Sequence, residues 1–236
     1  MTDVQRHALV SEDTAPTAWE QAYLRFETPE QEIRKFERRL VRLGARGWQH
    51  DAEILELFCG RGNGLRALRR LGFSRTQGVD LSLALARHHE GVGRVVVGDC
   101  RQLPFGDGSR DILIVQGGLH HLLDLPADLT RAIAEAARVL RPNGRLAIVE
   151  PWPTPFLAVV HRICRVPLAR KLSQRVDALA SMIDLERDTY ERWLAEAVLI
   201  RTTIAARFDV EYESVGWGKI TIVGRSRAAR QGLDCR

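Results

Sequence analysis

The sequence predicts a doubly wound α/β fold, in which helices cover both faces of a mostly parallel sheet. From residue 54 onward, short apolar runs alternate with stretches of helical spacing, as in parallel βαβ units. The runs are almost continuously apolar, which is typical of strands buried on both faces. The chain has 236 residues, of which 45% are hydrophobic. It can therefore bury a sizeable core, and global disorder is excluded.

Two amphipathic helices are expected in residues 17–50, before the first strand. Apolar and aromatic residues recur at helical spacing from Trp19 onward, and Thr28 stands before a proline in the position of an N-cap. Residues 1–14 contain several charges and lack the apolar stretch of a secretory signal. We therefore expect a disordered first dozen residues and a cytoplasmic protein.

Seven apolar runs predict the strands of the sheet. The first five are 54–58, 76–79, 95–97, 112–115 and 146–149, with helical spacing in 65–71, 82–90 and 129–140 between them. The last two runs, 208–215 and 219–223, are separated by a short glycine-containing link. Such a link permits an antiparallel hairpin at the C-terminal end of the sheet.

Residues 151–206 interrupt the alternation of strands and helices. This stretch is far longer than one crossover helix requires, and its apolar residues again have helical spacing. We interpret it as a helical cap insertion. The expected organisation is a single domain, 1–236, whose α/β core comprises 51–150 and 207–225.

Charge and cysteine content narrow the class of partner. The formal net charge is +5, but the basic residues are nearly all arginines and are spread along the chain, whereas a nucleic-acid-binding face concentrates them. The four cysteines match no zinc spacing and no disulfide framework, so we expect reduced thiols and no metal site. No window approaches 18 consecutive apolar residues, so no membrane span is expected.

The first predicted strand runs into a glycine-rich turn. Gly60, Gly62 and Gly64 follow it closely, and glycines at the end of a strand let a ligand lie against the backbone. A dinucleotide-binding loop would have its third glycine where Leu65 stands. Glu56, four residues before the first glycine, would repel a pyrophosphate and suit a cation. The loop is either a tight turn or a nucleoside site, and the spacing disfavours a nicotinamide-dependent oxidoreductase.

Acids at the ends of the next two strands favour the nucleoside interpretation. Asp80 follows the second run and could accept both hydroxyls of a ribose, while Asp99 follows the third run and could lie near an adenine amino group. Either acid alone could be a helix cap or a turn residue. Together with Glu56, they place a carboxylate at three consecutive strand ends.

These motifs resemble the class I S-adenosylmethionine-dependent methyltransferases, in particular their small-molecule, type 11-like group. The resemblance covers about 53–151 and includes Leu103-Pro104-Phe105 and the turn 141–145 before the fifth strand. It implies a Rossmann-like, seven-stranded, mostly parallel sheet with an antiparallel C-terminal hairpin. It also implies S-adenosyl-L-methionine as the cofactor and a small-molecule methyl acceptor.

The resemblance assigns roles along the loop and the strand ends. Glu56 would bind the methionine amino group, and Gly60 and Gly62 would admit the methionine and the ribose. Asp80 would hold the ribose hydroxyls. The remaining cofactor contacts would come from Asp99, the amide of Cys100, and Gln116 at the methionine end. Phe58 stands in the loop where the family usually has glycine, which leaves the loop conformation open.

Candidate catalytic groups follow the fourth and fifth strands. Methyl transfer depends mainly on alignment, which can supply roughly 7–11 kcal/mol, so a base is optional. His120 and His121 follow one strand and Glu150 follows the other, and imidazole is a suitable base near neutral pH. The alternative is that the histidines only pack. Similar pairs occur in family members that methylate sugars and other natural-product hydroxyls, so the resemblance favours the hydroxyl of a glycan or secondary metabolite.

Two further groups could act outside the strand ends. Tyr23 either reaches the methionine carboxylate or belongs to the core. Five basic residues of the insertion form either a solvated face or a contact with an anionic acceptor. They are Arg162, Arg165, Arg170, Lys171 and Arg175.

Two rival functions share the cofactor. An RNA or DNA methyltransferase is disfavoured because 116–119 reads Gln-Gly-Gly-Leu, not Asn/Asp-Pro-Pro-aromatic, and because no cysteine follows a proline. Ribose and other base positions stay open. A non-catalytic protein that keeps the cofactor pocket also stays open.

Overall fold

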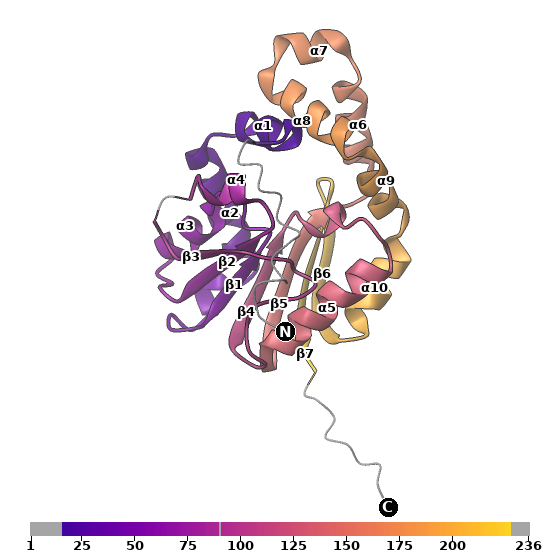
Figure 1. Ribbon diagram of the computed structural model, residues 1–236. Helices are drawn as coiled ribbons and strands as arrows, with labels where there is room; N and C mark the ends of the chain where they lie inside the picture. The colour runs from indigo at the N-terminus through magenta and orange to yellow at the C-terminus, as the bar shows by residue number, and fades with distance from the viewer. Residues whose placement is uncertain (1–15, 90, 228–236) are drawn as a thin grey trace, which may run out of the picture.

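A seven-stranded sheet runs through the part of the chain that the computed structural model describes, residues 16–89 and 91–227 (Figure 1). The strands are β1 (Ile54–Leu57), β2 (Thr76–Asp80), β3 (Arg94–Val97), β4 (Arg110–Gln116), β5 (Leu140–Pro151), β6 (Phe208–Gly216) and β7 (Lys219–Ser226). Their order is β3-β2-β1-β4-β5-β7-β6. The predicted disorder of the first dozen residues lies outside the described residues.

The strand directions confirm the predicted fold class. Strands β1 to β5 are parallel, and β7 is antiparallel to both β5 and β6. Strand β1 pairs with β2 on one side and with β4 on the other. The sheet grows from β1 towards β3 and then from β4 in the opposite direction, so the strand order reverses between β1 and β4. In open α/β sheets, ligands bind outside the carboxyl ends of the strands at such a reversal. The topology therefore places the candidate site above β1 and β4.

Helices cover both faces of the sheet. On one face, Ile33 and Leu40 of α2 pack with Leu65 and Leu68 of α3. On the other face, residues of α5 and α10 pack with Leu55 and other inward residues of the sheet. The bounds are α2 (Pro29–Arg42), α3 (Asn63–Arg70), α5 (Ala127–Val139) and α10 (Ala197–Ala205).

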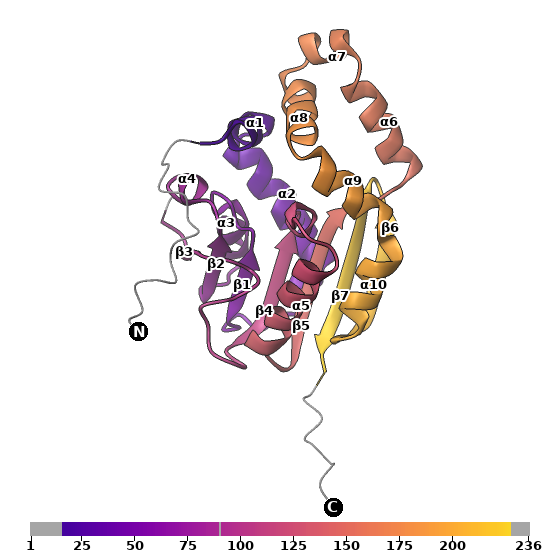
Figure 2. The same cartoon turned by 45° about the vertical axis from the view of Figure 1, so that its right-hand side comes forward.

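The N-terminal helices form where the sequence predicts them. Thr17 caps α1 (Ala18–Phe26) and Thr28 caps α2, each in a capping box with the residue three positions on. Helix α1 does not cover the sheet. It lies beyond the carboxyl ends of the strands and packs against α8 (Gln174–Leu185) (Figures 1 and 2). This contact closes the upper side of the site.

Residues 155–205 are helical, but they do not form one unit. Helices α6 (Pro155–Cys164), α7 (Pro167–Leu172) and α8 project above the strand ends (Figure 2). Helix α9 (Arg187–Ala195) descends from them, and α10 packs against α5 and β6. Helix α10, the last part of the predicted insertion, therefore belongs to the helical layer that covers one face of the sheet.

Two predicted boundaries are wrong. Helix α4 (Leu83–Ala86) is only one turn long, because the amides of His88 and His89 bond to carbonyls three residues back. Strand β5 begins at Leu140, six residues before its apolar run. The pairing with β4 then shifts from Leu140 to Arg145, so the turn between them is a bulge within the strand. Within the described residues, no helix combines the length and the apolar character that a membrane span needs.

Candidate functional site

A cavity of about 710 Å³ lies at the carboxyl ends of the strands, between the sheet and helices α1 and α8. Its volume is in the range of small-molecule sites. It is lined by Glu56, Phe58, Gly60, Asp80, Asp99, Cys100, Gln116, His120, His121 and Glu150. The structure thus brings together every predicted site residue except Gly62. A Cβ atom at Gly62 would lie 2.2 Å from the ring of His89, so this glycine serves packing behind the loop.

Phe58 fits into the loop because of a glycine on another strand end. Its φ is 55°, in the left-handed region, which a non-glycine residue adopts at a cost. A Cβ atom at Gly118 would lie 2.1 Å from Cγ of Phe58. The ring therefore occupies the space that a side chain at Gly118 would need. Phe58, which stands where the resembled family usually has glycine, is therefore accommodated by Gly118.

Glu56 is ready to accept a cation. Its side chain is 3% exposed, its Oε1 accepts from Gln116 Nε2 at 3.1 Å, and its Oε2 has no partner. Gly64 leaves room for the carboxylate, since a Cβ atom there would lie 2.0 Å from Glu56 Oε1. Burial raises the pKa of Glu56 to about 8; the Gln116 hydrogen bond opposes this, and the carboxylates of Glu32 and Asp80 add to it.

The unpaired atoms at this point test whether the cofactor fits. Glu56 Oε2 and Gln116 Oε1 are both buried acceptors without a donor. Unsatisfied buried acceptors are costly, and a protonated amine would satisfy both. The residues present therefore fit the amino group of a methionine moiety.

Asp80 closes the loop from the neighbouring strand. Its Oδ2 accepts from the amide of Gly60 at 2.7 Å, and its Oδ1 accepts from the amide of Ser82 at 2.9 Å. Burial raises the pKa of Asp80, although both of these hydrogen bonds oppose the shift. Each oxygen keeps a lone pair, so the carboxylate can still accept from two ribose hydroxyls.

Asp99 has a partner that the sequence analysis missed. Arg101 donates to both of its oxygens, with Nη2 2.7 Å from Oδ2 and Nε 3.0 Å from Oδ1, and also reaches Asp128 at 2.9 Å. The hydrogen bonds from Arg101 hold the pKa of Asp99 below its usual value. Asp99 is thus a fixed carboxylate at the cavity wall. At Cys100, burial raises the thiol pKa to about 12, so the thiol stays neutral.

The histidines join a chain of four titratable groups. His120 Nδ1 donates to Glu150 Oε2 at 2.7 Å, and Glu150 Oε1 accepts from the amides of Gly118 and Leu119. His120 Nε2 lies 3.8 Å from Glu186 Oε1, and His121 Nδ1 lies 2.6 Å from Glu186 Oε2. Burial lowers the pKa of His120, but the Glu150 carboxylate and its hydrogen bond outweigh burial and raise it overall.

Glu186 carries no sequence signal. It stands between α8 and α9, outside every motif. His120, His121 and Glu186 each offer one ligand atom, and these atoms lie within 4.8 Å of one another. This group could hold a metal ion, which the spacing of the residues did not indicate. Glu150 behind His120 is the arrangement that orients a ligating or a basic imidazole.

Comparisons with known proteins give the family. A family model described as a methyltransferase domain matches residues 55–148. A demethylmenaquinone methyltransferase of Corynebacterium kroppenstedtii is 30% identical over 72% of this chain and 71% of its own length. The chain belongs to the class I S-adenosylmethionine-dependent methyltransferases. The predicted family and its cofactor, S-adenosylmethionine, are confirmed.

The coverage of other relatives limits what family membership implies for this chain. A demethylmenaquinone methyltransferase of Corynebacterium glutamicum is 36% identical over 45% of each chain, and this methyltransferase spans about half the length of the first curated relatives it matches. The PH0226 protein of Pyrococcus horikoshii has a TM-score of 0.66 at 18% identity, with 90% of this chain and 100% of that chain covered. That likeness concerns the fold.

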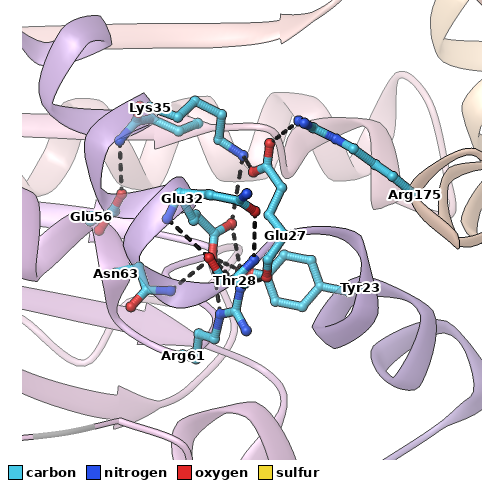
Figure 3. Close-up of polar contacts among 11 residues, drawn as sticks. Tyr23, Glu27, Thr28, Glu32, Lys35, Glu56, Arg61, Asn63 and Arg175 are labelled. Atoms are coloured by element: carbon cyan, nitrogen blue, oxygen red, sulfur yellow. Dashed lines mark hydrogen bonds and ion pairs between the residues drawn. The ribbon is translucent and has the colours of Figure 1, made fainter. Parts of the chain in front are cut away.

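A buried network ties the N-terminal helices of the methyltransferase to its glycine loop (Figure 3). Glu32 is 2% exposed and accepts from Arg61 Nε at 3.0 Å, from Asn63 at 2.9 Å and from the Tyr23 hydroxyl at 3.0 Å. Tyr23 therefore donates to Glu32 while its ring lines the cavity. Burial raises the pKa of Tyr23 well above its usual value.

The cap is pinned to the same network by an ion pair. Arg175 of α8 binds the carboxylate of Glu27, which also binds Lys35 (Figure 3). Arg170 pairs with Asp177 and Asp184 within the cap. None of the five basic residues of the predicted insertion lines the cavity. The solvated-face interpretation fits Arg162, Arg165 and Lys171, which are exposed. Four other cations do line the cavity, namely Arg101, which is paired with Asp99 and Asp128, and Lys35, Arg39 and Lys219.

Proposed function

We propose that the protein transfers a methyl group from S-adenosylmethionine to a hydroxyl of a small molecule of the secondary-metabolite type. The observation that carries the proposal is the position of His120. Its Nδ1 is held by Glu150, and it shares one cavity with the cation-accepting pair Glu56 and Gln116. A base and the expected methionine end of the cofactor site therefore belong to the same cavity.

The cofactor half of the cavity acts by positioning. When bound, S-adenosylmethionine supplies an electrophilic methyl group on a sulfonium. Glu56 and Gln116 accept hydrogen bonds from the amino group, and Asp80 accepts them from the ribose. Fixing both ends of the cofactor aligns the reacting atoms, and alignment is the largest contribution that this chemistry needs.

His120 handles the proton of the acceptor. The hydroxyl gives its proton to Nε2, and Glu150 stabilises the imidazolium through Nδ1–H. The amides of Gly118 and Leu119 fix the position of the Glu150 carboxylate. A positioned base of this kind contributes on the order of 10²–10⁴-fold.

The apolar part of the cavity wall indicates the body of the acceptor. Apolar side chains of α2 and α8 line it, including Phe36, Leu179, Met182 and Ile183. The many hydroxyls of a glycan would lose their hydrogen bonds against such a wall. An acceptor with an aromatic or alicyclic body fits it better.

A demethylmenaquinone-like acceptor is the second candidate. It is favoured by the named activity of the Corynebacterium relatives and by the same apolar wall. A reduced quinone also offers a hydroxyl that His120 could deprotonate. The two candidates differ in the acceptor and share the cofactor site.

The test separates cofactor binding from transfer. Asp80→Asn should weaken S-adenosylhomocysteine binding measured by calorimetry, while the exposed control Asp51→Asn should not. His120→Gln should leave that binding unchanged and lower transfer of labelled methyl groups.

Reduced demethylmenaquinone, a catechol, methyl glucoside and unfractionated RNA serve as acceptors. Labelling of RNA alone, or unchanged binding in a folded Asp80→Asn variant, would refute the proposal.

A further inference from the structure

Three cations stand at one end of the cavity. Lys35 and Arg39 come from α2, and Lys219 begins β7. Lys219 is paired in register with Pro151, the last residue of β5. Strand β7 lies three positions from β1 in the sheet, which is about 14 Å at a strand spacing of about 4.8 Å. Lys219 therefore lies well away from the glycine loop on β1, whereas Lys35 is linked to that loop through Glu32.

Two of these cations have no direct anionic partner. Lys35 binds Glu27 and lies 3.7 Å from Glu32. Within the described ranges, the side chains of Arg39 and Lys219 make no hydrogen bond and no ion pair with the protein. The guanidinium of Arg39 lies 5.6 Å from the ring centre of Phe36, a contact that offers no acceptor for its five donors.

Both side chains are partly buried, and they repel each other. Burial lowers the pKa of Lys219 to about 7, with Arg39 and Lys35 adding to the effect and Glu27 and Glu150 opposing it. Burial likewise lowers the pKa of Arg39; the carboxylates of Glu27, Glu32 and Glu150 oppose this shift, and Arg42 adds to it. Unpaired cations in a desolvated place destabilise a protein. Such groups cluster at functional sites, where a ligand can supply the missing anion.

A second cavity opens behind the same two side chains. It is about 460 Å³ in volume and shares Arg39, Val149 and Lys219 with the main cavity, and Arg42 adds a further cation to it. The cations thus stand where the two cavities meet. A molecule whose apolar body lies against α8 would direct its far end to them.

We propose that the methyl acceptor carries an anionic group, a carboxylate or a phosphate, which Arg39 and Lys219 bind at the end of the cavity away from the glycine loop. This inference rests on the proposed function, because it names the chemical class of the acceptor. It separates the two candidate acceptors, since demethylmenaquinone has no such group. Arginine suits the planar, two-point binding of either anion.

The experiment compares probes that differ only in charge. The full chain, saturated with S-adenosylhomocysteine, is titrated with 2-naphthoate, with its neutral amide 2-naphthamide and with 2-naphthyl phosphate. We expect one of the anions to bind at least tenfold more tightly than the amide. The tighter of the two anions tells a carboxylate acceptor from a phosphate acceptor.

The variants are Arg39→Gln and Lys219→Met, with Arg38→Gln as the matched control. Arg38 is an exposed neighbour on the same helix and does not line the cavity. Each cavity variant should weaken the anion at least tenfold and leave the amide and S-adenosylhomocysteine unaffected. The control should behave as the wild type.

Two results would overturn the proposal. Equal affinity for anion and amide would show that the cations do not select charge. A loss of S-adenosylhomocysteine affinity in the cavity variants would assign the cations to the methionine carboxylate. Failure of the proposed function is a different result, namely no S-adenosylhomocysteine binding or no transfer. The naphthoate titration of the cofactor-free chain still tests the cations in that case.

Discussion

Replacing Glu56 with glutamine should remove the pH dependence of cofactor binding. The pKa of Glu56 is raised to about 8, so at pH 7 roughly nine-tenths of the molecules carry a protonated side chain. An amine donor needs the ionised form. Binding at pH 7 should therefore release about 0.9 of a proton, and affinity should fall almost tenfold for each pH unit below 7.

The same substitution should stabilise the protein without its cofactor. The pKa of Glu56 in the folded protein lies above the unfolded value of 4.5. The free energy of unfolding therefore decreases as pH rises from 4.5 towards 8. At pH 7, about 2.5 pH units at roughly 1.4 kcal/mol each give a loss of about 3 kcal/mol. Glutamine avoids this loss, and its Oε1 can keep the hydrogen bond from Gln116 Nε2.

Calorimetry and denaturation check the two halves of this prediction. S-adenosylhomocysteine is titrated at pH 6 and pH 7, where an amino group stays protonated, in buffers of different ionisation enthalpy. Urea unfolding at pH 4.5 and pH 7 gives the stability difference between Glu56→Gln and the wild type. Glu53→Gln, near the start of the same strand and paired with Arg75, is the control. Wild-type binding without proton release at pH 7 would refute the reasoning.

Three further predictions concern packing, the buried network and the cationic end. Gly118→Ala should cost about 1–3 kcal/mol by overpacking against Phe58, and Phe58→Gly should relieve that cost in urea unfolding; an equal cost in both backgrounds would contradict it. Glu32→Gln should cost about 3–5 kcal/mol by leaving a buried guanidinium unpaired, and a loss below about 1 kcal/mol in the same assay would speak against the network. With a pKa of about 7, Lys219 has roughly 700 times more free amine at pH 7.5 than an ordinary lysine. Peptide mass spectrometry should therefore find it acetylated before the exposed Lys171, and equal rates would exclude the shift.

The cofactor half of the site could be predicted because its residues lie close to strand ends. Glu56, Asp80 and Gln116 each end or nearly end a strand, and parallel strands bring their carboxyl ends to one edge. The fold class was enough to place them together. Gly62 shows where this reasoning stops, since a glycine in the motif can face a neighbouring side chain instead of the ligand. His89 comes to lie behind Gly62 only through the tertiary fold.

The acceptor half could not be predicted in the same way. Glu186 meets His121 across the cavity from a helix junction far along the chain, and no local pattern encodes that contact. The density of basic residues in the insertion was equally uninformative. Dense charge indicates exposure to solvent, as at Arg162 and Lys171. A cation that acts on a ligand is usually single and partly buried.

Helical position could have singled out Arg39. It lies three residues after Phe36, so both side chains face the same side of α2, whereas Arg38 is turned by about 100° towards solvent. An arginine on the apolar face of an amphipathic helix is unusual, because burial of an unpaired charge is costly. Lys219 has no such signal, because side chains alternate along a strand and its neighbours on the same face are Thr221, Val223 and the exposed Arg225. An isolated charge on an apolar helix face, as at Arg39, is therefore a better guide to the acceptor site than a run of charge.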